Sequence, residues 1–115
     1  MANIEGKKFG LLGLDVFNVA VELGDLIYRL GLRGSMRDQL VRASESVVLN
    51  ISEAHPASGA DRARRFQNAL NELSEMRGAV TILKLRRTIT AAKFDELWNL
   101  IERVGAMLYR LVHPR

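Results

Sequence analysis

The chain has 115 residues, contains no cysteine and carries a formal net charge of +4 at pH 7. This length predicts one domain with a core of its own, and the lack of cysteine excludes disulfides and thiolate metal sites. No apolar run approaches the ~20 residues of a membrane-spanning helix, and no secretory segment is recognisable, so we expect a cytoplasmic protein without membrane contact. Only two prolines occur, which favours an all-α fold.

We expect residues 1–11 to form a flexible N-terminal arm and residues 12–113 to form a single helical domain. The first helix is predicted over about 13–30, because its apolar residues recur at the three-and-four spacing that places side chains on one helical face. Gly31 and Gly34 are typical of a helix exit. The apolar stripe consists of Val16, Val19, Ala20, Leu23, Leu26, Ile27 and Leu30.

The second helix is predicted to begin after Ser35, which suits the N-cap, and to reach about Ala54. Its main stripe is joined by further apolar residues on a second face, namely Val41, Val48 and Leu49. A helix that is apolar on so many sides is buried against more than one neighbour. Either this helix lies centrally in the monomer, or a subunit interface covers its second face. The main stripe consists of Met36, Leu40, Ala43, Val47 and Ile51.

A break around Pro56 precedes a long third helix, predicted from Ser58, its expected cap, to about Thr88. Thr90 is expected to cap a fourth helix that ends near Val112. Short loops between long helices predict antiparallel neighbours, so the chain reads as an up-down-up-down four-helix bundle. The two stripes are Phe66, Ala69, Leu70, Leu73, Met76, Val80 and Leu83, then Phe94, Leu97, Ile101, Val104, Leu108 and Leu111.

The positive charge is concentrated in residues 58–93, which hold eight basic and three acidic residues. Such an excess indicates an anionic partner, and guanidinium groups pair well with phosphate oxygens. We weigh contact with DNA or RNA evenly against a solvated face with pairs such as Asp61–Arg65. No base-reading motif is present, so binding would be independent of sequence. The candidate nucleic-acid-binding residues are Arg37, Arg42, Arg62, Arg64, Arg65, Lys84, Arg86, Arg87 and Lys93.

No residue set resembles a catalytic site. A phosphate-binding loop, a nucleophile elbow and a nucleotide fingerprint are all missing. His55 and His113 lie near predicted helix ends, where a loop or capping role is more common than a metal site. We therefore expect a non-enzymatic protein without cofactor, metal or catalytic residues, and a small-ligand or metal enzyme ranks a poor third.

The block from Ala43 to Ala54, Ala-Ser-Glu-Ser-Val-Val-Leu-Asn-Ile-Ser-Glu-Ala, resembles a motif of a bacterial four-helix-bundle family. This family includes proteins encoded in intervening sequences of 23S ribosomal RNA genes and the accessory variability proteins of diversity-generating retroelements. Its most specific part is Asn50-Ile51-x-Glu53. The segments 14–17 and 69–76 resemble two further family blocks, so the likeness covers about residues 12–111. Arginine replaces most of the family's aromatic residues early in the third helix.

The resemblance implies a bundle that assembles into a ring, commonly a homopentamer. In the retroelement branch it also implies a basic surface that engages nucleic acid and a reverse transcriptase. Because aromatic residues are enriched in subunit interfaces, Phe17 and Trp98 are interface candidates, as are Val41 and Val48 on the second helix.

Asn50 and Glu53 share one helical face. They could form a polar network that reaches a neighbour or ligand, but we favour a structural role in which they satisfy groups at the helix end and hold the hairpin.

Two functions therefore remain open. The first is a ring-forming helical protein that binds nucleic acid, or an enzyme acting on nucleic acid, through its basic surface. The second is a protein–protein scaffold or adaptor whose basic face serves only solubility.

Overall fold

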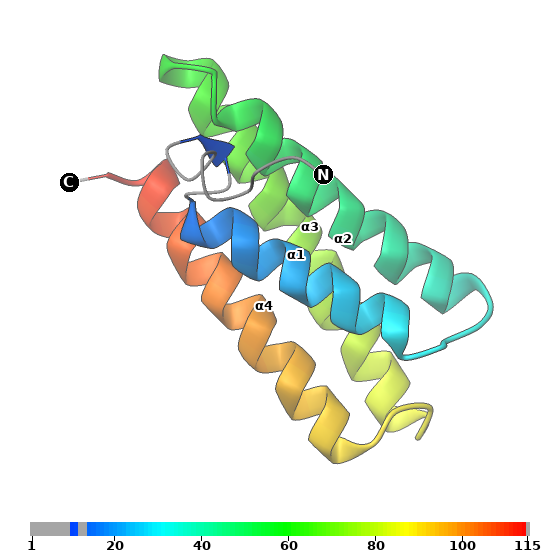
Figure 1. Cartoon of the computed structure of the whole chain (residues 1–115). Coiled ribbons are helices and arrows are strands. Elements are labelled where there is room, and N and C mark those ends of the chain that lie inside the picture. Colours follow the sequence, from blue (N-terminus) through cyan, green and yellow to red (C-terminus); the bar gives the residue numbers. More distant parts are fainter. Residues whose placement is uncertain (1–9, 12–13, 115) are drawn as a thin grey trace.

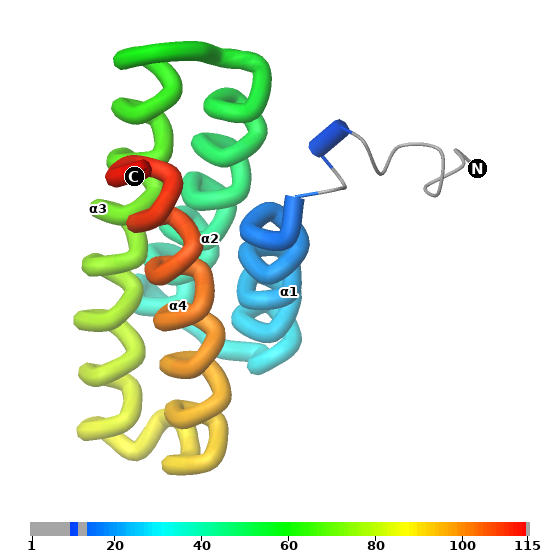
Figure 2. The backbone as a smooth tube through the Cα atoms, turned by 90° about the vertical axis from the view of Figure 1, so that its left-hand side faces the viewer, coloured from blue at the N-terminus to red at the C-terminus, as the bar shows by residue number. Residues whose placement is uncertain are grey.

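The computed structural model describes residues 10–11 and 14–114, and this part of the chain folds into an antiparallel four-helix bundle (Figure 1). The α1–α2 and α3–α4 connections lie at one end of the bundle, and the α2–α3 connection lies at the other (Figure 2). The described residues contain no strand, which confirms the predicted all-α class. Most of the expected N-terminal arm lies outside the described residues. The helices are α1 Asp15–Arg29, α2 Ser35–Ala54, α3 Gly59–Leu85 and α4 Ala91–Val112.

Each helix packs mainly against two neighbours. Helix α1 contacts α2 and α4, and α3 contacts the same two helices from the other side. The 27 residues of α3 correspond to about 40 Å of helix at 1.5 Å per residue. This long helix therefore reaches both ends of the bundle and can carry charged groups at each of them.

The core consists mainly of the predicted stripes, with Ala54, Ala79, Ile89 and Leu100 as buried residues that the stripes did not include. Phe66, Leu73, Met76 and Val80 of α3 are fully buried, and they meet similarly buried residues from the other three helices. Leu70 is only partly buried and packs at the edge of this core. Burial of apolar surface at about 25 cal/mol per Å² is the main force that joins the helices. The largest buried side chains of the other helices are Leu23, Ile27, Leu40, Val47, Ile51, Leu97, Ile101 and Leu108.

Two of the three predicted residues, Thr90 and Ser58, occupy the N-cap position, and one of these two makes the capping hydrogen bond. The Thr90 hydroxyl accepts a hydrogen bond of 3.1 Å from the Lys93 backbone N–H, as expected for an N-cap. Ser58 occupies the N-cap position of α3, but its side chain makes no capping hydrogen bond. Ser35 is not an N-cap, because Gly34 takes that position with φ +85° and Ser35 is the first helical residue. A glycine adopts this backbone conformation at little cost, and serine does not.

Helix α2 is not central in the monomer. It packs against α1 and α3, and its second apolar face stays open, because Leu49 is 59% exposed and Val41 and Val48 are only partly buried. Of the two alternatives that the sequence left open, the structure therefore rules out the first.

Candidate nucleic-acid interface

The nine basic residues singled out in the sequence divide into two groups. Five of them form ion pairs with carboxylates in the described part of the chain, and the other four do not. Ion pairs at the protein surface neutralise a charge locally, so the paired residues contribute less to an anion-binding surface. The paired residues and their partners are Arg37 with Asp38, Arg42 with Glu72 and Glu75, Arg64 with Asp61, Arg65 with Asp61 and Glu53, and Lys93 with Glu96.

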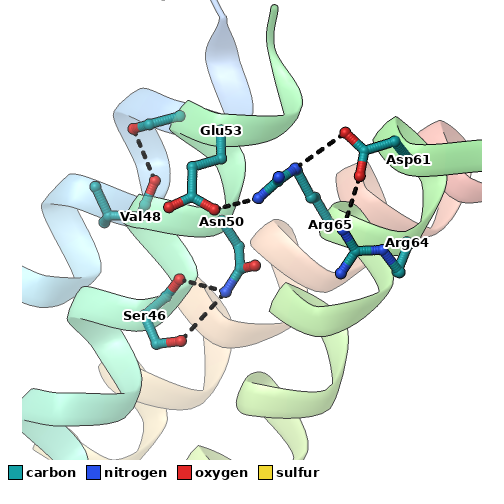
Figure 3. A network of polar contacts seen from close by, with 8 residues as sticks. Ser46, Val48, Asn50, Glu53, Asp61, Arg64 and Arg65 are labelled. Atoms are coloured by element: carbon teal, nitrogen blue, oxygen red, sulfur yellow. Dashed lines mark hydrogen bonds and ion pairs between the residues drawn. The ribbon is translucent and has the colours of Figure 1, made fainter. Parts of the chain in front are cut away.

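Three of these ion pairs form a network at the α2–α3 hairpin (Figure 3). Arg65 of α3 pairs with Glu53 of α2 and also donates to Asp61 at 3.3 Å, while Arg64 donates to Asp61 at 2.7 Å. The hydrogen bonds from Arg64 and then Arg65 lower the pKa of the Asp61 carboxyl below its ordinary value of 3.8. Asp61 therefore stays ionised at neutral pH and holds both arginines within the hairpin.

The family motif residues lie beside this network. Ile51 is fully buried in the core. The Asn50 amide donates to the Ser46 carbonyl at 2.9 Å and to the Ser46 hydroxyl at 3.2 Å, one turn back in the same helix (Figure 3). The last backbone groups of α2, which we expected Asn50 to satisfy, are therefore not its hydrogen-bond partners. Glu53 links α2 to α3 through Arg65.

Lys84, Arg86 and Arg87 remain at the other end of α3. All three are exposed, and none pairs with a carboxylate among the described residues. The Lys84 ammonium lies 4.3 Å from the ring centroid of Phe94 on α4, a cation–π contact that fixes its position. The α1–α2 connection lies at this same end (Figure 2) and carries exposed Arg33, which is also unpaired within the described chain. We call Arg33, Lys84, Arg86 and Arg87 the basic end.

Arg87 adopts a backbone conformation that favours glycine. Its φ is +58°, in the left-handed region, and it follows Arg86, the C-cap residue of α3. The Thr88 N–H bonds to the Leu83 carbonyl at 2.9 Å and the Arg87 N–H bonds to the Lys84 carbonyl at 3.0 Å, the pattern of a Schellman motif. A non-glycine residue in this conformation costs roughly 1–2 kcal/mol. The chain thus places a guanidinium group at a position where glycine would be more stable.

The structure adds residues that we did not select from the sequence. Arg33, Arg103 and Arg110 are exposed and have no carboxylate partner in the described part of the chain. A local signal could have found them, because none has Asp or Glu three or four positions away, the spacing that allows pairing within a helix. Among the original candidates the same test singles out Arg62, Lys84, Arg86 and Arg87, together with Arg37, which instead pairs with the adjacent Asp38.

An apolar groove lies between α1 and α2. It has a volume of about 320 Å³ and contains two interface candidates, Val41 and Val48. Three exposed apolar residues also line it: Val21 is 43%, Tyr28 68% and Leu49 59% exposed. The other two interface candidates, Phe17 on α1 and Trp98 on α4, are partly buried against the core and do not line this groove. We call this feature the α1/α2 groove.

Within the described residues, His, Asp and Glu do not gather in groups of three that could hold a metal ion. The four described helices are also too short or too polar to cross a membrane. The candidate site therefore consists of charged and apolar surfaces on a frame of four packed helices. This architecture is that of the four-helix-bundle proteins.

Comparison with known proteins identifies the family. A sequence model of the 23S rRNA-intervening sequence protein family matches residues 13–110, and the chain therefore belongs to this family. The structure is similar to the crystal structure of a protein of unknown function from the S23 ribosomal protein family of Bacteroides thetaiotaomicron. The TM-score is 0.81 at 24% sequence identity, and the match covers 85% of this chain and 95% of that chain. A search of curated proteins finds no significant match.

Proposed function

We propose that this protein is a non-catalytic, ring-forming helical bundle that binds nucleic acid through its basic end without reading base sequence. The observation that carries the proposal is Arg87, which keeps a guanidinium group in a backbone conformation that favours glycine. Residues held in sparsely populated backbone conformations cluster at functional sites. Lys84 and Arg86 beside it are exposed and free of carboxylate partners among the described residues.

Phosphate contact explains this arrangement. Guanidinium groups donate bidentate hydrogen bonds to phosphate oxygens, and each phosphate neutralised releases counterions. Contacts to the phosphate backbone carry no sequence information, so we expect similar affinities for unrelated sequences. Either an RNA or a DNA strand meets this requirement, and an enzyme acting on such a strand, such as a reverse transcriptase, is a further partner that the family resemblance suggests.

Self-association would multiply a weak contact. One basic end with four unpaired cations gives modest affinity at cellular salt, but several copies held in a ring bind one strand through avidity. The α1/α2 groove supports the ring, because exposed Val21, Tyr28 and Leu49 offer apolar area for a second copy to cover. The family resemblance suggests five subunits.

A fluorescence-anisotropy titration with single- and double-stranded DNA and RNA at two salt concentrations tests the proposal. We expect binding at low salt that weakens as salt rises. The variant K84Q/R86Q/R87Q should lose most of the affinity. The slope of the logarithm of the binding constant against the logarithm of salt concentration should also become less steep, by about 0.9 for each phosphate contact that is lost. The matched control R37Q/R64Q/K93Q removes the same charge from paired residues and should bind nearly as well. No binding at low salt would refute the proposal.

The α1/α2 groove favours a second candidate function, a protein–protein scaffold or adaptor. In that case the groove receives a helix of another protein, and the basic end serves solubility. Affinity purification that returns one protein partner, unaffected by nuclease treatment, would favour this function over nucleic-acid binding.

A further inference from the structure

A second pair of unpaired arginines lies at the opposite end of the bundle from the basic end. Arg62, in the first turn of α3, and Arg110, near the end of α4, line one pocket of about 340 Å³. The sequence separates these residues by nearly fifty positions. The antiparallel packing of α3 against α4 brings the start of α3 and the end of α4 to the same end of the bundle (Figure 2). The remaining lining residues are small or apolar and include Leu111 and Val112, so the two arginines are the charged residues that line this pocket.

Neither arginine is neutralised by a described carboxylate. Asp61, the acidic residue next to Arg62, is held by Arg64 at 2.7 Å and by Arg65 at 3.3 Å. Arg110 also borders a neighbouring hollow that contains Asp15 and Arg103. Asp15 forms no ion pair with Arg110 within 4.0 Å, nor with any other described residue.

Arg62 is held in place without a carboxylate. Its guanidinium carbon lies 5.3 Å from the ring centroid of Phe66, one turn along α3, and Phe66 is fully buried. A cation–π contact of this kind fixes the direction of the guanidinium group but leaves its hydrogen-bond donors available. Gly59, the first residue of α3, also lines the pocket, so the positive end of the helix dipole adds to the potential of the two arginines.

We propose that this pocket binds a phosphate monoester, either free or at the end of a nucleic-acid strand. Two guanidinium groups around one hollow repel each other until an anion with several acceptor oxygens lies between them, and a phosphate monoester carries about two negative charges at neutral pH. The pocket is separate from the basic end. Phosphate binding here therefore does not depend on whether the basic end binds nucleic acid.

The test uses the full chain labelled with ¹⁵N and follows the Nε–Hε signals of its arginine side chains by NMR. Inorganic phosphate is the first probe. We expect the Arg62 and Arg110 signals to shift in a saturable way, and R110Q should weaken phosphate binding at least fivefold. R29Q is the control, because it removes one exposed arginine at the opposite end of the bundle that belongs neither to this pocket nor to the basic end. Its phosphate binding should be unchanged.

A second arm identifies the source of the phosphate. Short oligonucleotides with a 5′-phosphate or a 5′-hydroxyl are compared in the K84Q/R86Q/R87Q background, where most of the binding expected at the basic end is lost. Tighter binding of the phosphorylated strand supports a strand end as ligand, whereas equal binding with a retained response to inorganic phosphate supports a free phosphate ester.

Circular dichroism checks that R110Q is folded, and R62Q provides an independent second variant. The proposal is overturned if the Arg62 and Arg110 signals do not respond to phosphate. It is also overturned if R29Q weakens binding as much as R110Q, because the effect would then reflect net charge alone. Failure of the basic end to bind nucleic acid would leave these outcomes unaffected.

Discussion

The guanidinium group of Arg77 on α3 lies against Gly105 on α4, so closely that a Cβ atom at position 105 would come within 3.0 Å of the Arg77 Nη2 atom. From this position Arg77 Nε donates a hydrogen bond of 2.9 Å to Glu102 Oε1. Gly105 is buried and lies in the interior of helix α4. The missing side chain at position 105 therefore allows an arginine to cross the α3–α4 contact.

Gly105 and Gly78 should respond differently to alanine. Gly78 is exposed in α3, and a Cβ atom there would meet no atom within 4 Å, so G78A should raise the free energy of unfolding by about 0.5–1 kcal/mol. G105A should raise the free energy of unfolding by clearly less, because Arg77 has to move and its hydrogen bond to Glu102 weakens. Urea denaturation measures both values. In an R77A background the two alanines should become equivalent, and equal gains already in the native background would contradict the contact.

Leu73 and Leu85 form a matched pair for core burial. Leu73 is fully buried, whereas Leu85 on the same helix is 77% exposed. L73A should lower the free energy of unfolding by about 2–5 kcal/mol, because it removes buried methyl groups and leaves a cavity. L85A should change it by less than about 0.5 kcal/mol. Thermal or urea unfolding of the two variants gives the comparison, and similar losses would show that the helix faces are assigned incorrectly.

Replacing Arg87 by glycine should stabilise the protein and weaken the nucleic-acid binding that we propose. The left-handed backbone at φ +58° favours glycine, so R87G should raise the free energy of unfolding by about 1 kcal/mol. The same change removes one of the phosphate contacts proposed for the basic end and should reduce affinity in the anisotropy titration. R86Q is the control, since Arg86 has a right-handed helical backbone and should lose affinity without a gain in stability. A less stable R87G would count against the strain argument.

The Asp61 network should make stability depend on acidic pH. Arg64 and Arg65 lower the pKa of Asp61 in the folded state below its ordinary value of 3.8. The stabilisation is therefore complete above pH 3.8 and is lost as pH falls through the lower, folded-state pKa. The melting temperature of the native protein should exceed that of D61N at pH 6, and the difference should shrink below pH 3.8. A difference that is constant with pH would contradict the linkage.

The α1/α2 groove should control self-association. Leu49 lines the groove and is 59% exposed, so L49Q should lower its apolar character without disturbing the core. We expect a shift toward monomer at equal concentration in light scattering coupled to gel filtration. L85Q makes the same change at an exposed leucine outside the groove and should leave the mass unchanged. Identical masses for the native protein and L49Q would argue against this surface as the interface.

Most of the fold could be predicted from the sequence, because helix periodicity is a local property. The buried faces of all four helices follow from apolar residues three and four positions apart, and Pro56 and Thr90 mark two of the breaks. The cap predicted at Ser35 was wrong in position, because Gly34 is the N-cap residue of α2. Ser58 is the N-cap residue of α3 but lacks the capping hydrogen bond, since water satisfies exposed backbone groups without a side chain. Such choices differ by less than about 1 kcal/mol and leave little trace in sequence.

The charged surface was predictable only in part. Pairs three or four residues apart, such as Asp61 with Arg64 and Arg65, can be read from the chain. Arg42 with Glu75 at 2.8 Å and Arg77 with Glu102 at 2.9 Å join residues more than twenty positions apart. The sequence by itself determined four amphipathic helices and an excess of positive charge, because both depend on neighbours along the chain. Only the tertiary structure decided which cations are neutralised and which share a pocket, because those contacts depend on the packing of one helix against another.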